Sequence, residues 1–289
     1  MSTVLNSQIT ALVGANVDQI IPLSGGCVGD VFQAELSDGR TIVVKTADPG
    51  TPAAQGLSIE AKMLQYQRNN STLPVPDVLA VDDGMLLMSR LENGGGLGTT
   101  VQEDAASIVA QMHSITTDQG YGFEFDTVIG GLHQPNPWTK RWLVFFRDQR
   151  LMYMGRNAER MGRLPTSVLN RLNSFCDHLD RWIFEPNQPA LIHGDMWSGN
   201  VLSAHGRITG FIDPAIYYAH PEIELAFTTM FSTFGKPFFQ AYQSIHPIEP
   251  GFFEERLYIY NLYPLLVHVR LFGGSYVSSI DTTLKRFGF

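Results

Sequence analysis

Three polar residues occur at short intervals between positions 191 and 213, each next to an apolar stretch. Asp195 ends the run LIHGD, Asn200 follows five residues later, and Asp213 ends the run RITGFID thirteen residues further on. Short apolar runs bounded by Gly, Asn and Asp are typical of strands joined by tight turns. The pattern therefore predicts a short hairpin that holds polar side chains near its ends.

Asp195 and Asn200 have the Asp-x-x-x-x-Asn spacing of a kinase catalytic loop. Phosphoryl transfer needs a carboxylate near the attacking hydroxyl and an amide oxygen on a Mg²⁺ ion, and Asp213 can bind the metal that bridges the β- and γ-phosphates. Read alone, an aspartate before proline is more often a turn former. We expect His193 to order the loop rather than to act as a base.

A glycine cluster lies between two predicted strands near the N-terminus, in LSGGCVGDVF (23–32). Gly25, Gly26, Cys27 and Gly29 belong to a loop whose backbone N–H groups can approach phosphate oxygens, because glycine has no Cβ. An ordinary glycine turn explains the cluster equally well when it is read alone. It is not a Walker A motif, because no Gly-Lys-Ser/Thr follows and the next element is a strand.

Lys45 and Glu60 are the candidate partners of that loop. Lys45 ends the apolar run TIVVK, and Glu60 lies inside a helix that apolar periodicity predicts over 51–70. Each residue type is commonly a solvated surface residue at such a position. Together with the glycine loop they match the parts that hold a nucleotide, in which the lysine contacts the α- and β-phosphates and the helical glutamate orients it.

The first third of the chain reads as β-rich and the rest as mainly helical. Turns are expected at 37–39 and 82–84, since both end in glycine after aspartate. Strands are predicted within 18–26, 30–47 and 74–92, and helices over 101–116, 136–161 and 165–185.

The segment NGGGLG (93–98) breaks the pattern and is predicted to be a hinge or linker, because consecutive glycines are costly in any regular element. The predicted fold is α+β and bilobal, like that of the protein kinases. We expect residues 1–92 to form a small β-rich nucleotide-binding lobe. Residues 93–289 are expected to form a larger, mainly helical lobe with the catalytic loop and the substrate site.

Composition excludes several classes of protein. A net charge of −8 disfavours nucleic-acid binding. The two cysteines, Cys27 and Cys176, form no CxxC motif, so neither a disulfide framework nor a zinc site is expected. The apolar stretch 257–272 is too short and too polar to span a bilayer. A signal peptide would require Lys or Arg near the N-terminus, and neither occurs in the first 39 residues. We therefore expect a cytoplasmic protein.

HGDMWSGNVL and FIDPA, standing where protein kinases have HRD and DFG, resemble the aminoglycoside phosphotransferase and choline kinase superfamily of small-molecule kinases. No APE motif follows, which disfavours a protein kinase. Within that superfamily, HGDMWSGNVL…GFIDPAIYYAHPEIELAF (193–227) resembles the fructosamine kinase (ketosamine-3-kinase) family, and SGGCVGDVF resembles its GGC phosphate loop. The resemblance covers nearly the whole chain.

The resemblance implies an ATP- and Mg²⁺-dependent kinase that phosphorylates O3 of ketosamines, either small or protein-bound, and so supports deglycation. Asp195 would then be the catalytic base, Asn200 and Asp213 the metal ligands, and Lys45, Glu60 and the glycine loop the triphosphate ligands. The segment MSRL, formed by Met88, Ser89, Arg90 and Leu91, would face adenine through its backbone; family members often carry an acidic residue where Ser89 stands.

Several alternatives remain open from the sequence. Trp197 is either a wall of the sugar site or a core tryptophan. His220 and Glu222 either contact the substrate or only open a helix, where acidic residues suit the helix dipole. Cys27 is either a plain loop residue or a redox-sensitive thiol.

The substrate class and the oligomeric state are open as well. The ketosamine can be a fructosamine, a ribulosamine or an erythrulosamine. The chain can instead phosphorylate an amino alcohol, an aminoglycoside or a thio-sugar, or bind nucleotide without catalysis. No sequence feature sets the oligomeric state.

Overall fold

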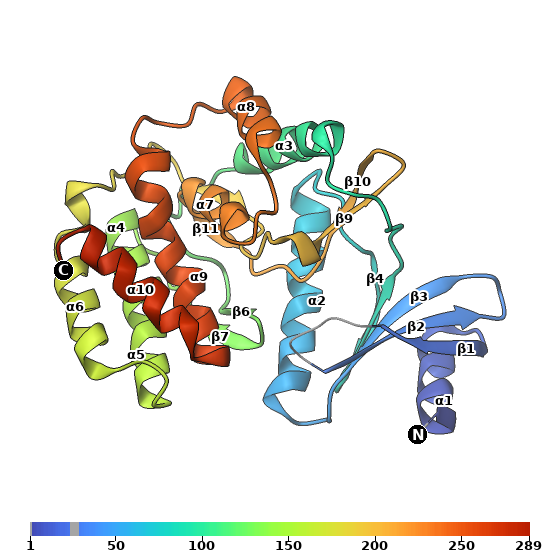
Figure 1. Ribbon diagram of the computed structural model, residues 1–289. Coiled ribbons are helices and arrows are strands. Elements are labelled where there is room, and N and C mark those ends of the chain that lie inside the picture. The colour runs from blue at the N-terminus through green and yellow to red at the C-terminus, as the bar shows by residue number, and fades with distance from the viewer. Residues whose placement is uncertain (1, 24–28) are drawn as a thin grey trace. The chain divides into compact units, whose positions relative to one another are not determined.

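The computed structural model describes residues 2–23 and 29–289, and the chain forms two compact units (Figure 1). The first unit contains residues 1–101 together with Gly199–Pro214, and the second contains Gln102–Ser198 together with Ala215–Phe289. The boundary expected after residue 92 falls inside the first unit. The first unit also includes a hairpin that the sequence assigned to the helical lobe.

The first unit is built on a five-stranded antiparallel sheet in the order β1-β2-β3-β5-β4. Its elements are α1 (Ser2–Val13), β1 (Val17–Pro22), β2 (Asp30–Leu36), β3 (Thr41–Thr46), α2 (Pro52–Asn70), β4 (Val78–Asp82) and β5 (Met85–Ser89). The predicted turns occur where expected, with Gly39 and Gly84 both at φ +85°, a conformation that glycine adopts without strain. The predicted α+β class, with a β-rich part before a helical part, is confirmed.

The two faces of the sheet are covered by different helices. Ile42 and Val44 of β3 pack with Ile9 of α1 in one apolar core, whereas Lys45 contacts Glu60 of α2. Successive side chains of a strand point to opposite faces, so the alternation along β3 separates a structural face from a polar one.

Helix α1 was not predicted from the sequence, although its signal is present. Leu5, Ile9, Leu12 and Val13 recur at the spacing of one helical face, and all four pack against the sheet core. The segment also contains several β-branched residues, which lower helix propensity. Packing of the apolar face therefore decides its structure.

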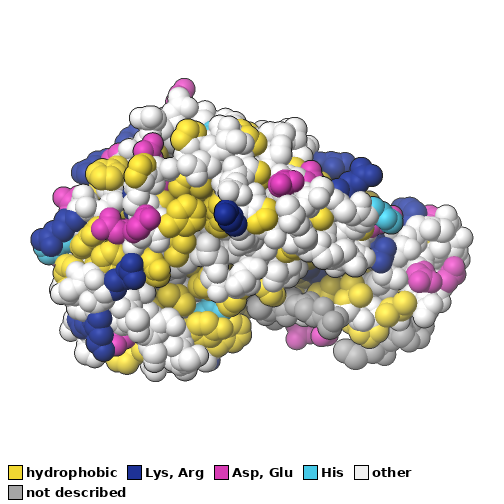
Figure 2. Space-filling model, turned by 45° about the horizontal axis from the view of Figure 1, so that its top comes forward, with side chains coloured by type: hydrophobic (Ala, Val, Ile, Leu, Met, Phe, Trp, Pro, Cys, Tyr) yellow, Lys and Arg dark blue, Asp and Glu magenta, His cyan; other side chains and the backbone are white. Residues whose placement is uncertain are grey.

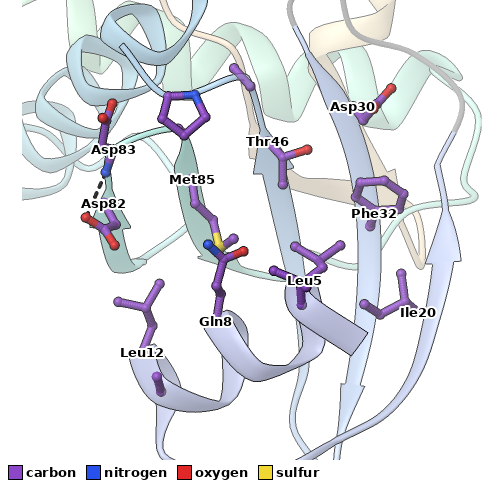
Figure 3. A pocket seen from close by; sticks show the side chains of 15 residues that line it. Leu5, Gln8, Leu12, Ile20, Asp30, Phe32, Thr46, Asp82, Asp83 and Met85 are labelled. Carbon is purple, nitrogen blue, oxygen red and sulfur yellow. Dashed lines mark hydrogen bonds between the residues drawn. The ribbon is translucent and has the colours of Figure 1, made fainter. Parts of the chain in front are cut away.

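A cavity of about 630 Å³ lies between α1 and the sheet (Figure 3). Leu5 and Leu12 of α1 line it together with Phe32, Thr46 and Met85 of the sheet. Thr46 follows Lys45 along β3, so the cavity lies on the face of the sheet opposite to the lysine. It is therefore separate from the candidate nucleotide ligands.

The hairpin of β9 (Val201–Ala204) and β10 (Arg207–Phe211) is attached to the first unit by backbone contacts. Phe211 donates its N–H to the Pro74 carbonyl (2.8 Å), and Gly95 in the glycine-rich linker donates to the Ser203 carbonyl (2.7 Å). A Cβ on Gly95 would lie 2.9 Å from that same carbonyl oxygen. The predicted linker thus has a second role, because it pairs with the hairpin.

The second unit is mainly helical, as predicted. Its elements are α3 (Thr99–His113), β6 (Thr127–Ile129), β7 (Leu132–Gln134), α4 (Trp142–Phe145), a π-helical stretch (Phe146–Met152), α5 (Tyr153–Arg160), α6 (Thr166–Cys176), a 3₁₀ turn (Leu179–Arg181), β8 (Ala190–Ile192), β11 (Tyr217–Ala219), α7 (Glu222–Met230), α8 (Lys236–Ile245), a second π-helical stretch (Phe252–Arg256), α9 (Leu257–Phe272) and α10 (Ser275–Arg286). A further 3₁₀ turn (Ser198–Asn200) begins at the last residue of the second unit and continues into the Gly199–Pro214 segment of the first. The helix predicted over 136–161 begins at Trp142, and the one predicted over 165–185 ends at Cys176.

On the face drawn in Figure 2, Lys and Arg side chains are scattered among Asp and Glu side chains. Within the described residues, no helix combines the length and the apolar character needed to cross a bilayer.

We predict that Ile9→Ala lowers the free energy of unfolding of the first unit by about 2–5 kcal/mol, because it removes fully buried methyl groups from the core under α1. The control Val4→Ala lies on the same helix at a side chain that is 67% exposed and should change stability by less than about 0.5 kcal/mol. Urea unfolding should be followed by far-UV circular dichroism, because all four tryptophans lie in the second unit. Equal effects of the two substitutions would contradict the assigned packing of α1.

Candidate active site

A buried lysine between two carboxylates forms the polar centre of the first unit. Lys45 Nζ lies 2.6 Å from Glu60 Oε1 and also forms an ion pair with Asp213 Oδ1. The lysine and Glu60 side chains are about one-tenth exposed, and that of Asp213 is one-third exposed. The three residues proposed from the sequence as nucleotide and metal ligands are thus in contact.

Each member of this cluster is placed by a different element. Lys45 lies near the end of β3, opposite Leu86 of the neighbouring strand β5, and Glu60 lies in the middle of α2. Asp213 follows β10 and has φ +53°, a left-handed conformation that aspartate tolerates better than most residues. A strand end, a helix and a hairpin end therefore meet at one ammonium group.

The charges in the cluster determine how its members titrate. Burial disfavours the charged form of Lys45, but the carboxylates of Glu60 and Asp213 outweigh burial and raise its pKa above the ordinary value. Burial raises the pKa of Glu60, and the charge of Asp213 adds to this effect while Lys45 opposes it. The lysine remains cationic, and two carboxyl groups share one positive charge.

Asn200 lies at the open end of the hairpin, opposite Ile212, the residue before Asp213. Ile212 donates its N–H to the Asn200 carbonyl (3.0 Å), immediately after the last β9–β10 pair, Val201 with Phe211. The thirteen-residue spacing between Asn200 and Asp213 is therefore the length of one hairpin.

This part of the site fits a divalent cation with phosphate ligands. Mg²⁺ is usually bound by one or two carboxylates, several waters and substrate phosphates rather than by a cage of protein ligands. Asp213 provides a partly exposed carboxylate, Asn200 lies at the same hairpin end, and the cluster contains more carboxyl groups than cations. Among residues 2–23 and 29–289, no group of three His, Cys, Asp or Glu side chains suited to a metal occurs.

Only one residue of the predicted phosphate loop can be placed. Gly25, Gly26 and Cys27, with the proposed redox role of Cys27, lie outside the described residues. Gly29 has φ +73°, and a Cβ on it would lie 2.1 Å from the Thr46 carbonyl oxygen of β3. Glycine is therefore required at position 29, where the chain enters β2 next to the end of the strand that carries Lys45.

The segment 88–91 continues the sheet toward the linker. Met88 is buried and pairs with Val43 of β3, while Ser89 exchanges hydrogen bonds with Asp77: its N–H donates to the Asp77 carbonyl (2.9 Å) and its Oγ accepts from the Asp77 N–H (2.8 Å). Arg90 donates to Gln33 Oε1 (2.8 Å) at the surface.

The last residue of this segment contacts the hairpin. A Cβ on Gly210 of β10 would lie 2.2 Å from the Leu91 side chain, so glycine at position 210 makes room for the leucine. Contacts of this kind place the segment within the first unit.

Asp195 belongs to the second unit and follows β8, which pairs with β11. Its own N–H donates to His193 Nδ1 (3.3 Å), and the Ala215 N–H donates to the His193 carbonyl (2.8 Å). Asp195 is partly buried, and its charge acts on the buried phenol of Tyr263, whose pKa is raised first by burial. His193 thus orders the loop through its backbone and its ring.

Trp197 is 38% exposed, so the alternative of a core tryptophan does not apply. Its ring meets the ring of Phe231, which is about one-third exposed, at a centroid distance of 6.1 Å in an edge-to-face arrangement. Trp197, two residues after Asp195, therefore belongs to an exposed aromatic pair with Phe231.

His220 and Glu222 are held by internal contacts. Both carboxylate oxygens of Glu222 accept hydrogen bonds from Arg256, each at 2.7 Å, and the residue is buried. His220 accepts the Glu222 N–H at Nδ1 (3.2 Å) and packs against the rings of Trp142 and Tyr260. Of the two alternatives that the sequence left open for these residues, these contacts favour the structural one.

The sequence did not identify the partners of the residue before Asp195. The Gly194 N–H donates to Glu224 Oε1 (2.7 Å), and the other oxygen of Glu224 contacts His113. These residues are far apart in the chain, so no local pattern joins them. The glycine in HGD was the available signal, because Gly194 has φ +86° and a Cβ on it would lie 2.2 Å from the Ala215 carbonyl oxygen.

Comparison with solved structures defines the class of fold. A thermostable mutant of aminoglycoside phosphotransferase APH(4)-Ia, in a ternary complex with ADP and hygromycin B, aligns with 99% of this chain and 99% of its own at a TM-score of 0.69 and 18% identity. A structure from Thermobifida fusca YX-ER1, described as a candidate fructosamine-3-kinase, aligns with 97% of each chain at a TM-score of 0.85 and 30% identity. The fold is therefore that of the aminoglycoside phosphotransferase-like kinases.

Sequence comparison identifies the family. A probable ketoamine kinase of Vibrio parahaemolyticus is 31% identical over 96% of this chain and 95% of its own length. The model of the fructosamine kinase family matches residues 1–287. The chain belongs to the fructosamine kinase family, which is a family of ATP-dependent phosphotransferases. The resemblance noted in HGDMWSGNVL and the DPA segment is confirmed.

We predict that Lys45→Met lowers the free energy of unfolding by about 3 kcal/mol, because it leaves the buried carboxyl group of Glu60 beside Asp213 without a cation. The double variant Lys45→Met/Glu60→Gln should recover at least half of this loss, since the neutral amide has no charge to compensate. Urea unfolding by circular dichroism, without nucleotide, measures both changes. A double variant that is as unstable as Lys45→Met would contradict the electrostatic explanation.

We also predict that His220 contributes to the acid sensitivity of the second unit. Burial, and then electrostatic interaction with Arg256 and His113, lower the pKa of His220 to about 3. Between that value and about 6.5, the ordinary pKa of histidine, the unfolded chain binds a proton that the native protein does not bind, so stability falls as the pH falls.

Substitution of His220 by a residue without an imidazole should remove this pH dependence of stability. The stability of wild type minus that of His220→Gln should decrease by up to about 1.4 kcal/mol for each pH unit between pH 6 and pH 4, as the proton linkage requires. Urea unfolding followed by tryptophan fluorescence at several pH values measures this difference. A difference that stays constant from pH 7 to pH 4 would show that His220 titrates normally in the folded protein.

Proposed function

We propose that this protein is a ketosamine-3-kinase, which transfers the γ-phosphoryl group of ATP to the O3 hydroxyl of a ketosamine. The Lys45–Glu60–Asp213 ion cluster carries the proposal, because it brings together a phosphate-binding cation and a metal-binding carboxylate. Membership of the fructosamine kinase family supports a ketosamine as the acceptor. The products are ADP and a ketosamine 3-phosphate, which decomposes and frees the amine, so the activity supports deglycation.

In this proposal Lys45 binds the α- and β-phosphates, and Glu60 keeps its ammonium group oriented and charged. Burial makes both roles effective, since an ion pair away from water is weakly screened. Gly25, Gly26, Cys27 and Gly29 are proposed to cover the phosphates. The backbone of 88–91 is proposed to face adenine.

Asn200 and Asp213 are proposed as the ligands of Mg²⁺. The ion, when bound with ATP, supplies positive charge that neutralises the charge developing on the β- and γ-phosphates. The left-handed backbone at Asp213 and the hydrogen bond between Ile212 and Asn200 hold the two ligands at one hairpin end. Their positions are therefore fixed within the first unit before nucleotide binds.

Asp195 is proposed to orient the O3 hydroxyl and accept its proton as the bond from O3 to phosphorus forms and the bond from the γ-phosphorus to the β,γ-bridging oxygen breaks. The exposed rings of Trp197 and Phe231 are proposed to contact the amine side of the substrate. The secondary amine of a ketosamine is cationic when protonated, and aromatic faces attract such cations. We propose the cytoplasm as the compartment, since the buried thiol of Cys176 is free.

We predict that wild-type protein releases ADP when ATP, Mg²⁺ and a ketosamine are present, and that NMR of the product places the phosphate on O3. Fructosyl, ribulosyl and erythrulosyl derivatives of lysine should be compared, both free and in a peptide. Asp195→Asn should lower kcat at least about 100-fold, the scale of general-base catalysis, while the Kd for ADP changes less than about twofold.

Asp177→Asn is the matched control, because Asp177 is a surface carboxylate of the same unit that pairs weakly with Arg147. It should leave kcat unchanged. Normal turnover by Asp195→Asn would rule out Asp195 as the base. Absence of turnover by the wild type with every ketosamine would rule out the proposed substrate class.

A further inference from the structure

The cavity between α1 and the sheet is crossed by one row of paired residues. Thr46 of β3 pairs with Asp30 of β2 on one side and with Met85 of β5 on the other. Met85 in turn pairs with Asp82 of β4. Directly opposed residues of neighbouring strands point to the same face of a sheet, and all four line the cavity (Figure 3). The row therefore has a carboxylate at each end, with a hydroxyl and a thioether between them.

The other walls of the cavity are mainly apolar and incompletely packed. Leu5 and Leu12 of α1 line it and are only partly buried, as is Phe32 of β2. The neighbouring core is closed, since Ile9 of the same helix is fully buried. Sites for small molecules have volumes of about 300–1,000 Å³ and combine apolar walls with a few polar groups. A cavity of about 630 Å³ with this lining has the size and character of such a site.

The charges that line the cavity are all negative. Asp30, Asp82 and Asp83 are exposed, and no Lys, Arg or His occurs among the described residues of the lining. In the described part of the chain, the carboxylates that form ion pairs do not include these three. Asp83 Oδ1 accepts the Gly50 N–H (3.1 Å), which leaves its charge without a cation. The lining is therefore complementary to a positively charged ligand.

The spacing of the carboxylates selects the kind of cation. Within residues 2–23 and 29–289 no group of three acidic, His or Cys side chains is arranged to hold a metal, so the aspartates do not converge on one ion. Asp30 and Asp82 are separated by three strand spacings, about 14 Å. Two ammonium groups in contact with these carboxylates are then roughly 8–11 Å apart, the length of an extended chain of about six to eight methylene groups.

We propose that the cavity binds a linear aliphatic diammonium ion, with one ammonium group at Asp30 and the other at Asp82 and Asp83. The methylene chain lies across Met85, whose flexible thioether adapts to it, and is stabilised by leaving water for an apolar surface. The site lies on the face of the sheet opposite to Lys45, so this ligand and a nucleotide bind at different places. The inference does not rest on the proposed function, because binding is measured without turnover.

The first test is isothermal titration calorimetry of the full-length protein with octane-1,8-diamine at low ionic strength. We expect one site for each chain, with a Kd of roughly 1 mM for a ligand of this size. Butane-1,4-diamine has the same charge but cannot reach both ends of the row. It should bind at least about tenfold more weakly, because one ion pair and several buried methylene groups are lost. Equal affinity for the two diamines overturns the proposal.

Two substitutions test the ends of the row. Asp30→Asn and Asp82→Asn should each weaken binding of octane-1,8-diamine about two- to fivefold, the scale of an exposed ion pair. Asp18→Asn is the matched control, because Asp18 is an exposed carboxylate of β1 in the same sheet and does not line the cavity. It should leave the Kd unchanged. An equal loss in Asp18→Asn would mean that the diamine is attracted by the acidic protein in general.

A second measurement locates the ligand. In protein labelled with ¹³C at the methionine methyl groups, the Met85 resonance should move during the titration, and the Met85→Leu variant assigns it. Met63 is the internal reference, because it is fully buried in α2, the helix whose Glu60 contacts Lys45 on the other face of the sheet. Saturating ADP should not displace the diamine. An unmoved Met85 methyl group, or displacement by ADP, overturns the proposed site.

Discussion

A lysine ammonium buried between two carboxylates determines the polar architecture of the first unit. Lys45 draws together a strand, a helix and the end of a hairpin, and each of these elements reaches the cluster with a single charged side chain. An ion held so far from water is tolerated only when it is paired, so the three elements depend on one another. The same ion pairs keep the Lys45 ammonium group charged and fixed in orientation, and a side chain that binds phosphate needs both properties.

Local patterns made much of this predictable. The sheet followed from apolar runs between glycine turns, and Gly39 and Gly84 have the backbone conformation that such turns need. The pairing of Lys45 with Glu60 was inferred from the order of motifs, whereas the contact of Lys45 with Asp213, which was predicted only as a metal ligand, was not. The spacing of Asn200 and Asp213 was informative because the residues that flank an antiparallel pair become neighbours.

The features that were not predicted depend on tertiary contacts. The hairpin of β9 and β10 joins the first unit because its backbone pairs with Pro74 and Gly95, more than a hundred residues earlier in the chain. The residues of helix α1 have a weak intrinsic preference for the helical conformation, and the helix is stabilised by burial of one of its faces. Arg256 donates hydrogen bonds to both oxygens of the Glu222 carboxylate, and no spacing in the sequence predicts that ion pair. A local sequence pattern shows which residue types are present in one segment. These contacts instead depend on which segments pack against one another in the folded chain.

The two halves of the proposed machinery are each held by their own network of hydrogen bonds. In the first unit the ion cluster holds Asp213, and in the second unit Glu224 holds the backbone before Asp195. The networks differ in kind, because a charged cluster responds to the charge of a bound nucleotide or metal, whereas Glu224 joins the Gly194 N–H to the buried side chain of His113. Ligand binding should therefore change the electrostatics of the first unit, while the geometry of the loop that carries Asp195 is set in advance by folding of the second unit.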